Sequence, residues 1–274
     1  MAVVGVLVVV LGAAAGEVEA PLPPMETELE EQPSLAMRAL NPLSGLHTLP
    51  VTFAYDRTFM RRRDGEGDGF TVRLDPRVTF SLGPEWNLVW RSLVQLVARR
   101  SGPTGLADVY SGVFVAPVRP AFGRLWWGVG PAVSLPMATH PALGRSTMGV
   151  GLNAILLTQF AGWTVGTTLG HLQSVGFIDR IHTTLVQPFV SFTDETGWSL
   201  RVDCGAKRNG ATGEWLVPVS FQVDKLVEAD GRPVSLGAAV TLFPVGPVGA
   251  PDIGLELTVR LVFDDPETQG ESGG

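Results

Sequence analysis

The chain lacks most of the features that mark soluble enzymes and helical membrane proteins. Its 274 residues include one cysteine, Cys204, so no disulfide can form within the chain. After position 20, no run approaches the roughly 18 uncharged apolar residues that a helical membrane span needs. The sequence has no G-x-x-x-x-G-K-[ST] phosphate loop and no G-x-S-x-G nucleophile motif. The histidines show no ligand spacing with one another or with the cysteine, so we expect neither a metal site nor a cofactor.

Acidic charge is scarce in the middle of the chain, although the net charge is −7. Six of the 27 acidic residues precede position 41 and four follow Phe263, which leaves 17 acidic against 19 basic residues between them. The excess of negative charge therefore belongs to the two ends. Because no large basic stripe is present either, the sequence argues against a nucleic-acid partner.

The two ends differ in composition from the middle. Residues 1–20 form an apolar run followed by small residues, which is typical of a signal peptide, although no Lys or Arg precedes Arg38. An uncleaved buried helix is the alternative interpretation of this run. Residues 21–46 are predicted to be an acidic, Pro-rich linker that ends in a short helical turn over 34–40, and this stretch is a possible plug. Residues 264–274 are predicted to be a disordered acidic tail.

The middle of the chain shows a period of two. In residues 253–263, I-G-L-E-L-T-V-R-L-V-F, apolar side chains occupy every odd position, and Glu256, Thr258 and Arg260 lie between them. A soluble sandwich can show the same alternation, but about a dozen such segments follow one another here, bounded by Gly, Pro or Asp. We therefore predict an all-β fold, a single closed antiparallel transmembrane β-barrel over residues 47–263. The expected strands number twelve: 47–57, 70–82, 86–97, 106–116, 123–135, 146–158, 162–174, 180–192, 197–204, 213–224, 233–243 and 253–263.

The connections between these segments alternate in length. Tight turns such as L-G-P-E-W and T-D-E-T-G-W alternate with mostly longer loops at 58–69, 97–105, 136–145, 205–212 and 244–252. This asymmetry is typical of outer-membrane barrels, with both chain ends on the short-turn, periplasmic side. Trp86, Trp163 and Trp198 each follow a short turn, so we expect them in the aromatic girdle at that membrane boundary.

The alternation also predicts which side chains face the lumen. The inward positions carry charges of both signs, and the candidate lumen-lining and selectivity residues are Arg73, Asp75, Arg77, Arg91, Arg201, Asp203, Glu256 and Arg260. Such charges can set the field that a passing solute experiences. They can also simply pair across the sheet and fill a narrow barrel. Pro76, Pro131, Pro188 and Pro218 predict bulges or kinks within strands. The facing is uncertain in two segments that alternate poorly, 106–116 and 162–174.

An ordered set of short strings carries a resemblance to a known family. The strings are N-P-L-S-G-L-H-T-L-P-V-T-F-A-Y-D, W-N-L-V-W-R-S-L, G-L-A-D-V, W-W-G-V-G-P-A-V-S-L-P-M-A-T, Q-F-A-G-W-T-V-G, Q-P-F-V-S-F-T-D-E-T-G-W-S-L, W-L-V-P-V-S-F-Q-V-D-K and G-R-P-V-S-L-G. Over about residues 34–263 the chain resembles a family of bacterial outer-membrane proteins described as transporters, which is similar to the meta-pathway phenol-degradation channels. The resemblance implies a twelve-stranded outer-membrane barrel with a passive-transport role. It supplies no substrate and no binding residues.

Three functions are compatible with a barrel of this kind. We expect a passive channel or transporter for a small solute in the cell outer membrane. A non-conducting structural barrel is the alternative, with Arg61, Arg62 and Arg63 pairing with lipid phosphates. A barrel-borne lipid hydrolase is a third, because H-L-Q-S contains His171 and Ser174, but residues three apart face opposite sides of a regular strand. The expected partners are outer-membrane lipid, a small solute and the barrel-assembly machinery, which would recognise the last strand ending at Phe263.

Overall fold

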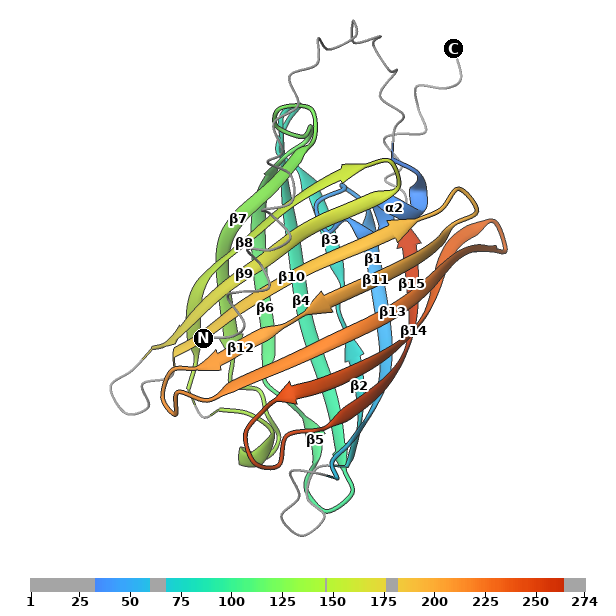
Figure 1. Cartoon of the computed structure of the whole chain (residues 1–274). Helices are drawn as coiled ribbons and strands as arrows, with labels where there is room; N and C mark the ends of the chain where they lie inside the picture. Colours follow the sequence, from blue (N-terminus) through green and yellow to red (C-terminus); the bar gives the residue numbers. More distant parts are fainter. Residues whose placement is uncertain (1–32, 60–67, 146, 176–181, 264–274) are drawn as a thin grey trace, which may run out of the picture. The chain divides into compact units, whose positions relative to one another are not determined.

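The chain forms one antiparallel sheet that closes into a barrel (Figure 1). The computed structural model describes residues 33–59, 68–145, 147–175 and 182–263; the predicted signal peptide, the C-terminal tail and Arg61 to Arg63 lie outside this part of the chain. No helix among the described residues is long and apolar enough to cross a membrane. The strand segments are β1 (His47–Arg57), β2 (Gly69–Leu74), β3 (Arg77–Ser81), β4 (Trp86–Arg99), β5 (Thr104–Leu106), β6 (Val109–Pro117), β7 (Leu125–Leu135), β8 (Gly149–Phe160), β9 (Trp163–Ser174), β10 (His182–Thr193), β11 (Trp198–Cys204), β12 (Ala206–Asn209), β13 (Trp215–Ala229), β14 (Arg232–Val245) and β15 (Ile253–Phe263).

These segments make twelve strands, because three strands are each divided into two pieces. β2 and β3 both pair with β1 and β4, β5 and β6 both pair with β4, and β11 and β12 both pair with β10 and β13. The first strand pairs with the last over its whole length, from His47 opposite Phe263 to Arg57 opposite Ile253. The predicted closed twelve-stranded barrel is therefore confirmed.

The outer wall of the barrel is apolar along the whole sheet. In β15, Leu255, Leu257 and Val259 are exposed, and Leu257 has 63% of its surface accessible. The residues between them, Glu256 and Thr258, are partly covered from the other side of the sheet. A soluble protein rarely exposes an apolar surface of this extent, and a closed sheet has no unpaired edge to present to hydrocarbon. The fold is that of a barrel whose outer wall contacts lipid.

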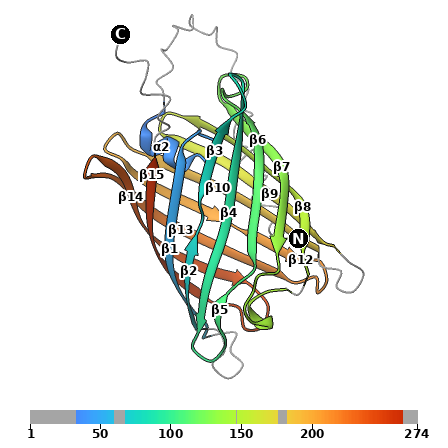
Figure 2. The ribbon, with the colours of Figure 1, turned by 180° about the vertical axis from the view of Figure 1, so that it is seen from behind.

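The two ends of the barrel differ in their connections, as Figure 2 shows from behind. Short connections lie at 82–85, 118–124, 161–162, 194–197 and 230–231, at the end of the barrel where β1 begins and β15 ends. The connections at the opposite end are mostly longer: 58–68, 100–103, 136–148, 175–181, 210–214 and 246–252. Three of the predicted loops were too long, because β4 and β14 extend further than expected and β12 continues the ninth strand beyond Cys204. Trp86, Trp163 and Trp198 are exposed on the outer wall at the short-turn end.

Proline and glycine mark the irregular places in the wall. Pro76 lies in the gap between β2 and β3, and the β13–β14 register shifts between Val217 and Val219, on either side of Pro218. Such shifts are expected where proline removes a ladder donor. A Cβ atom on Gly130 would lie 2.1 Å from the carbonyl oxygen of Val113 on the neighbouring strand. Gly130 therefore allows the close approach of the two strands.

Candidate functional site

The lumen is the candidate site, since the charged side chains of the strands point into it. All eight predicted lumen residues lie on the inner face, alternating with exposed apolar neighbours such as Val202 and Leu257. The strands carry seven of them: Arg73 on β2, Arg77 on β3, Arg91 on β4, Arg201 and Asp203 on β11, and Glu256 and Arg260 on β15. The eighth, Asp75, lies in the gap between β2 and β3. Their contribution to ion selectivity stays a prediction.

Most of these charges form ion pairs on the inner wall, either along one strand or with another strand. Arg91 binds Asp75 through two hydrogen bonds, from Nε at 2.7 Å and from Nη2 at 2.9 Å, and Arg77 donates a longer bond of 3.4 Å to the same carboxylate. Arg73 pairs with Glu256. Bidentate arginine–carboxylate geometry is the strongest form of such a pair. Mutual pairing, one of the two interpretations of the inward charge, therefore describes this part of the wall.

Several inward charges were missed from the sequence, among them Asp224 and Asp56. Asp224 on β13 is almost fully buried, and its Oδ1 lies 3.9 Å from Nη1 of Arg260. It was overlooked because the tenth strand was predicted to end there, whereas β13 continues to Ala229. Asp56, near the long-loop end of β1, interacts electrostatically with Arg73 and Glu256.

A short helix, α2 (Leu35–Leu40), lies against the inner wall at the short-turn end. Its N-cap is Ser34, whose hydroxyl accepts a hydrogen bond from the Met37 amide. Asn41 follows the helix and donates to Oε1 of Gln159 on β8 at 3.0 Å, and Gln159 Nε2 donates to the Met37 carbonyl at 3.3 Å. These contacts to inward-facing side chains place the segment inside the lumen.

Leu43 anchors the same segment in an apolar cluster on the inner wall. Its side chain has no accessible surface and packs with Val89, Phe114, Ala116, Ile155, Leu157 and Phe189, which come from β4, β6, β8 and β10. A Cβ atom on Gly128 would lie 3.0 Å from the Leu43 side chain, so that glycine leaves room for the leucine. The inner wall is therefore apolar around Leu43, whereas it carries polar side chains such as Gln159 where α2 lies. We call residues 33–46 the inner segment.

At the opposite end, the connection 136–148 also reaches the inner wall. Asp108, between β5 and β6, accepts hydrogen bonds from the backbone amides of Ala138 at 3.2 Å and Arg145 at 2.6 Å. Arg145 donates from Nη1 to the hydroxyl of Thr183 on β10 at 2.9 Å. Burial lowers the pKa of Arg145 while the Asp108 carboxylate raises it, and the guanidinium group still carries its charge at neutral pH. The loop thus adds a cation to the long-loop end of the lumen.

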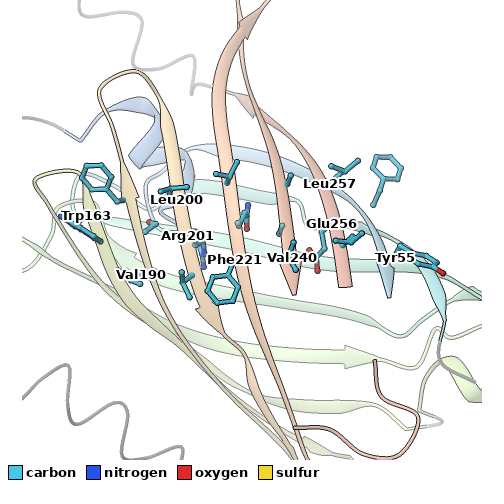
Figure 3. A pocket seen from close by; sticks show the side chains of 18 of the residues that line it. Tyr55, Trp163, Val190, Leu200, Arg201, Phe221, Val240, Glu256 and Leu257 are labelled. Atoms are coloured by element: carbon cyan, nitrogen blue, oxygen red, sulfur yellow. The ribbon is translucent and has the colours of Figure 1, made fainter. Parts of the chain in front are cut away.

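A hollow lies on the outer wall, across β9, β10, β11, β13, β14, β15, β1 and β2 (Figure 3). Outward side chains such as Leu200, Phe221 and Val240 line it, and the small Ala238 deepens it. Because these side chains belong to the apolar band that contacts lipid, acyl chains are sufficient to fill this hollow. It gives no support to a polar ligand site.

Two further candidates from the sequence are not assembled into a site. His171 is exposed on the outer wall, where its ring lies 6.3 Å from that of His182. Side chains alternate along β9, and Thr164 and Leu172 face the lumen. Ser174 is separated from both by an even number of positions, so it also faces the lumen, whereas His171 faces outward. His171 and Ser174 therefore lie on opposite faces of β9 and do not form the His–Ser pair of a hydrolase. The described residues also hold no group of three or more metal-ligating His, Cys, Asp or Glu side chains.

Comparison with known proteins gives structural neighbours only. No protein-family model and no curated protein matches the sequence. An outer membrane channel from Pseudomonas putida F1 is similar in structure, with a TM-score of 0.61 and 14% identity over 80% of this chain and 96% of that one. The porin NanC is also similar, with a TM-score of 0.54 and 10% identity over 78% of this chain and 98% of that one. At these identities the likeness establishes the outer-membrane barrel fold.

Proposed function

We propose that the protein is a channel or transporter of the outer membrane that passes a small solute through its lumen. The observation that carries this proposal is the charged inner wall inside an apolar outer wall. A barrel that served only as a scaffold in the membrane would not need ionised groups on its inner face. Apolar side chains could fill the interior without the free-energy cost of removing charges from water. The two structural neighbours, an outer membrane channel and a porin, support the proposal through their shared fold.

The proposal includes the place and the partners of the barrel. The apolar band and the three tryptophans at the short-turn end suit an outer-membrane lipid environment with the chain ends on the periplasmic side. Phe263 ends the last strand and is partly exposed, so it is available to the barrel-assembly machinery before the ring closes. The resemblance to the phenol-degradation channels stays part of this proposal and defines no solute by itself.

The proposal predicts that the inward arginines set the ion preference. In a narrow lumen, charges act at short range and are screened less than on an open surface. We expect the double variant Arg73→Gln/Arg77→Gln to shift the reversal potential toward cation preference. The measurement is the reversal potential of the refolded full-length protein in a planar bilayer across a salt gradient.

The matched control is the triple variant in which Arg61, Arg62 and Arg63 are replaced by glutamine. These residues belong to the connection 58–68, where bulk salt would screen their charge. The control should therefore change the reversal potential far less than the lumen variant. A larger shift from the loop variant would contradict the role assigned to the lumen.

A non-conducting structural barrel is the second candidate. It is favoured by one observation, the inner segment, which covers part of the lumen at the short-turn end. If the wild-type protein shows no conductance in the same bilayer experiment, this alternative replaces the channel. The two candidates therefore give opposite results in one measurement.

A further inference from the structure

Four arginines from four strand segments gather in the lumen. They are Arg77 on β3, Arg91 on β4, Arg201 on β11 and Arg260 on β15, and we call them the arginine cluster. Their side chains are largely covered, with relative exposures between 10% and 28%. Arg77 and Arg91 are directly opposite each other in the register of β3 and β4, and the charges of Arg201 and Arg260 also act on Arg77. Positive charges that lie close together and partly out of water need negative charges or hydrogen-bond acceptors nearby to be stable.

The carboxylates of the wall compensate this cluster incompletely. Asp75 is shared by Arg91 and Arg77, and Asp203 lies 3.6 Å from Nε of Arg201. Four arginines thus face three aspartates: Asp75, Asp203 and Asp224. Arg73 does not belong to the cluster, since it pairs with Glu256.

Neighbouring glutamines also compete for two of these aspartates. Gln222 donates its side-chain amide to both oxygens of Asp224, at 2.9 and 2.7 Å, and Gln187 donates to Asp203 at 3.0 Å. The Asp224 carboxylate therefore binds Gln222 closely and stays 3.9 Å from Arg260, which is beyond hydrogen-bond distance.

Several guanidinium nitrogens of the cluster consequently have no acceptor. Nε and Nη1 of Arg260 and Nε of Arg77 are buried, and none of the three donates a hydrogen bond to any residue in the described ranges. Arg260 as a whole is only 8% exposed. A buried charged donor without an acceptor is unfavourable, and arginine matches a carboxylate or another oxyanion in both charge and planar geometry. These nitrogens are therefore positioned for an anionic oxygen that the chain itself does not supply.

The apolar cluster of the inner segment borders the same place. The guanidinium carbon of Arg201 lies 4.4 Å from the centre of the Phe189 ring, and Phe189 packs in the cluster that contains Leu43. Phe189 is itself only 5% exposed, so the apolar cluster forms a packed wall next to the place that an anion bound to the arginines would occupy. An organic carboxylate with a small apolar body matches both surfaces, whereas inorganic phosphate matches only the donors.

We propose that the arginine cluster, with Arg260 as its principal donor, is a binding site for a small organic carboxylate inside the barrel. This inference rests on the proposed function, since it names the solute class of the same lumen. Arg260 Nε and Nη1 and Arg77 Nε supply the unpaired donors, and the apolar cluster that contains Phe189 lies next to the apolar part of the ligand.

The test is isothermal titration calorimetry of the refolded full-length protein in detergent micelles with sodium benzoate as the probe. We expect saturable benzoate binding, weaker binding of inorganic phosphate and no binding of benzyl alcohol, which has the ring without the charge. Arg260→Gln should weaken benzoate binding by about tenfold or more, because it removes a charge and a forked donor. The matched control is Arg208→Gln, since Arg208 lies over the outward Trp215 ring and should leave the affinity unchanged.

A second variant changes the affinity in the opposite direction. Asp224→Asn removes a negative charge beside Arg260, so it should tighten benzoate binding. If Arg260→Gln does not fold, the comparison of Asp224→Asn with the wild type decides the question. Three results would overturn the proposal: no benzoate binding by the wild-type protein, equal binding of benzyl alcohol, or no tightening in Asp224→Asn. Phosphate binding as tight as that of benzoate would overturn the role of the apolar surface.

The calorimetric result is independent of conduction. A barrel that binds benzoate but conducts nothing would refute the channel and keep the binding site. A barrel that conducts with anion preference but does not bind benzoate would refute the binding site and keep the channel.

Discussion

At the scale of single residues, Asp75 organises the charged wall more than any other carboxylate. It accepts both hydrogen bonds from Arg91 and a further one from Arg77. We expect Asp75→Asn to lower the free energy of unfolding by about 1.5–3 kcal/mol, since hydrogen bonds to charged groups are lost and two arginines lose their counter-charge. Urea unfolding in phospholipid vesicles measures this change. The control is Asp230→Asn, at an exposed turn position with φ +51° that asparagine also tolerates, and it should have little effect.

A pair of adjacent residues in β15 tests which side chains contact lipid. Leu257 is exposed on the outer wall, whereas Thr258 points inward, with its hydroxyl 2.9 Å from that of Thr52. Leu257→Arg should destabilise the barrel in bilayers by about 2–4 kcal/mol. Thr258→Arg should lose about 1 kcal/mol with its hydrogen bond. Equal effects, or the reverse order, in the same unfolding assay would mean that the register of β15 is shifted by one residue.

The charged inward residues could be predicted from the sequence because charge alternates with apolar residues in β2, β4, β11 and β15. The ion-pair partners of these residues could not be predicted from the sequence. Arg73 and Glu256 are far apart in sequence, and their pairing depends on β1 lying between β2 and β15 in the closed ring. Asp224 escaped notice for a local reason, as it lies within β13 where a strand end was expected.

At the scale of elements, the two strands with poor alternation have different causes. β6 places Phe114 and Ala116 on the inner face, where they contact the cluster around Leu43. Both faces of β6 are therefore apolar, and the period of two disappears from the sequence. On β9, glycines occupy inward positions, and a Cβ atom on Gly166 would lie 2.6 Å from the backbone of Leu156. The sequence could show that these two strands differ, but not that an inner segment covers one of them.

The short turn 194–197 predicts a dependence of stability on pH. The Thr196 hydroxyl and the Trp198 amide donate to the Asp194 carboxylate, and these bonds hold its pKa below the ordinary value of 3.8. A group with a lowered folded-state pKa stabilises the fold fully above its unfolded value, and this contribution is lost as the pH falls through the folded value. The stability difference between the wild type and Asp194→Asn should therefore be constant above about pH 5 and should diminish below about pH 4. Unfolding measured from pH 6 to pH 2 checks this, and a difference independent of pH would contradict it.

At the scale of the whole molecule, the inner segment and the ring of strands together define the lumen. Removing residues 33–46 takes Leu43 and α2 away from the inner wall, so we expect a larger single-channel conductance than that of the wild type. Leu43→Met is the control, since it nearly conserves volume and should leave the conductance close to that of the wild type. Equal conductance of the deletion variant and the wild type would show that the inner segment does not limit flow.

The number of strands and the closure of the ring could be predicted from the sequence, because an open edge is not stable in hydrocarbon. The position of the inner segment could not be predicted. Its sequence is apolar at Met37, Ala39 and Leu40, which is compatible with packing on either side of a wall. Its place is decided by hydrogen bonds to Gln159, 118 and 122 residues away in the chain.

The pairing of β1 with β15 has a consequence for the order of folding. His47 meets Phe263, so the first strand has no second neighbour until the last strand has been synthesised. The ring therefore closes late, through contacts of the greatest sequence separation, which are the slowest to form. The inner segment is joined to the first strand and packs on β4, β6, β8 and β10, so its contacts depend on these strands being brought together in one ring. The kinetics of assembly should thus show a slow final phase, and variants of Leu43 should alter this phase more than variants on the outer wall.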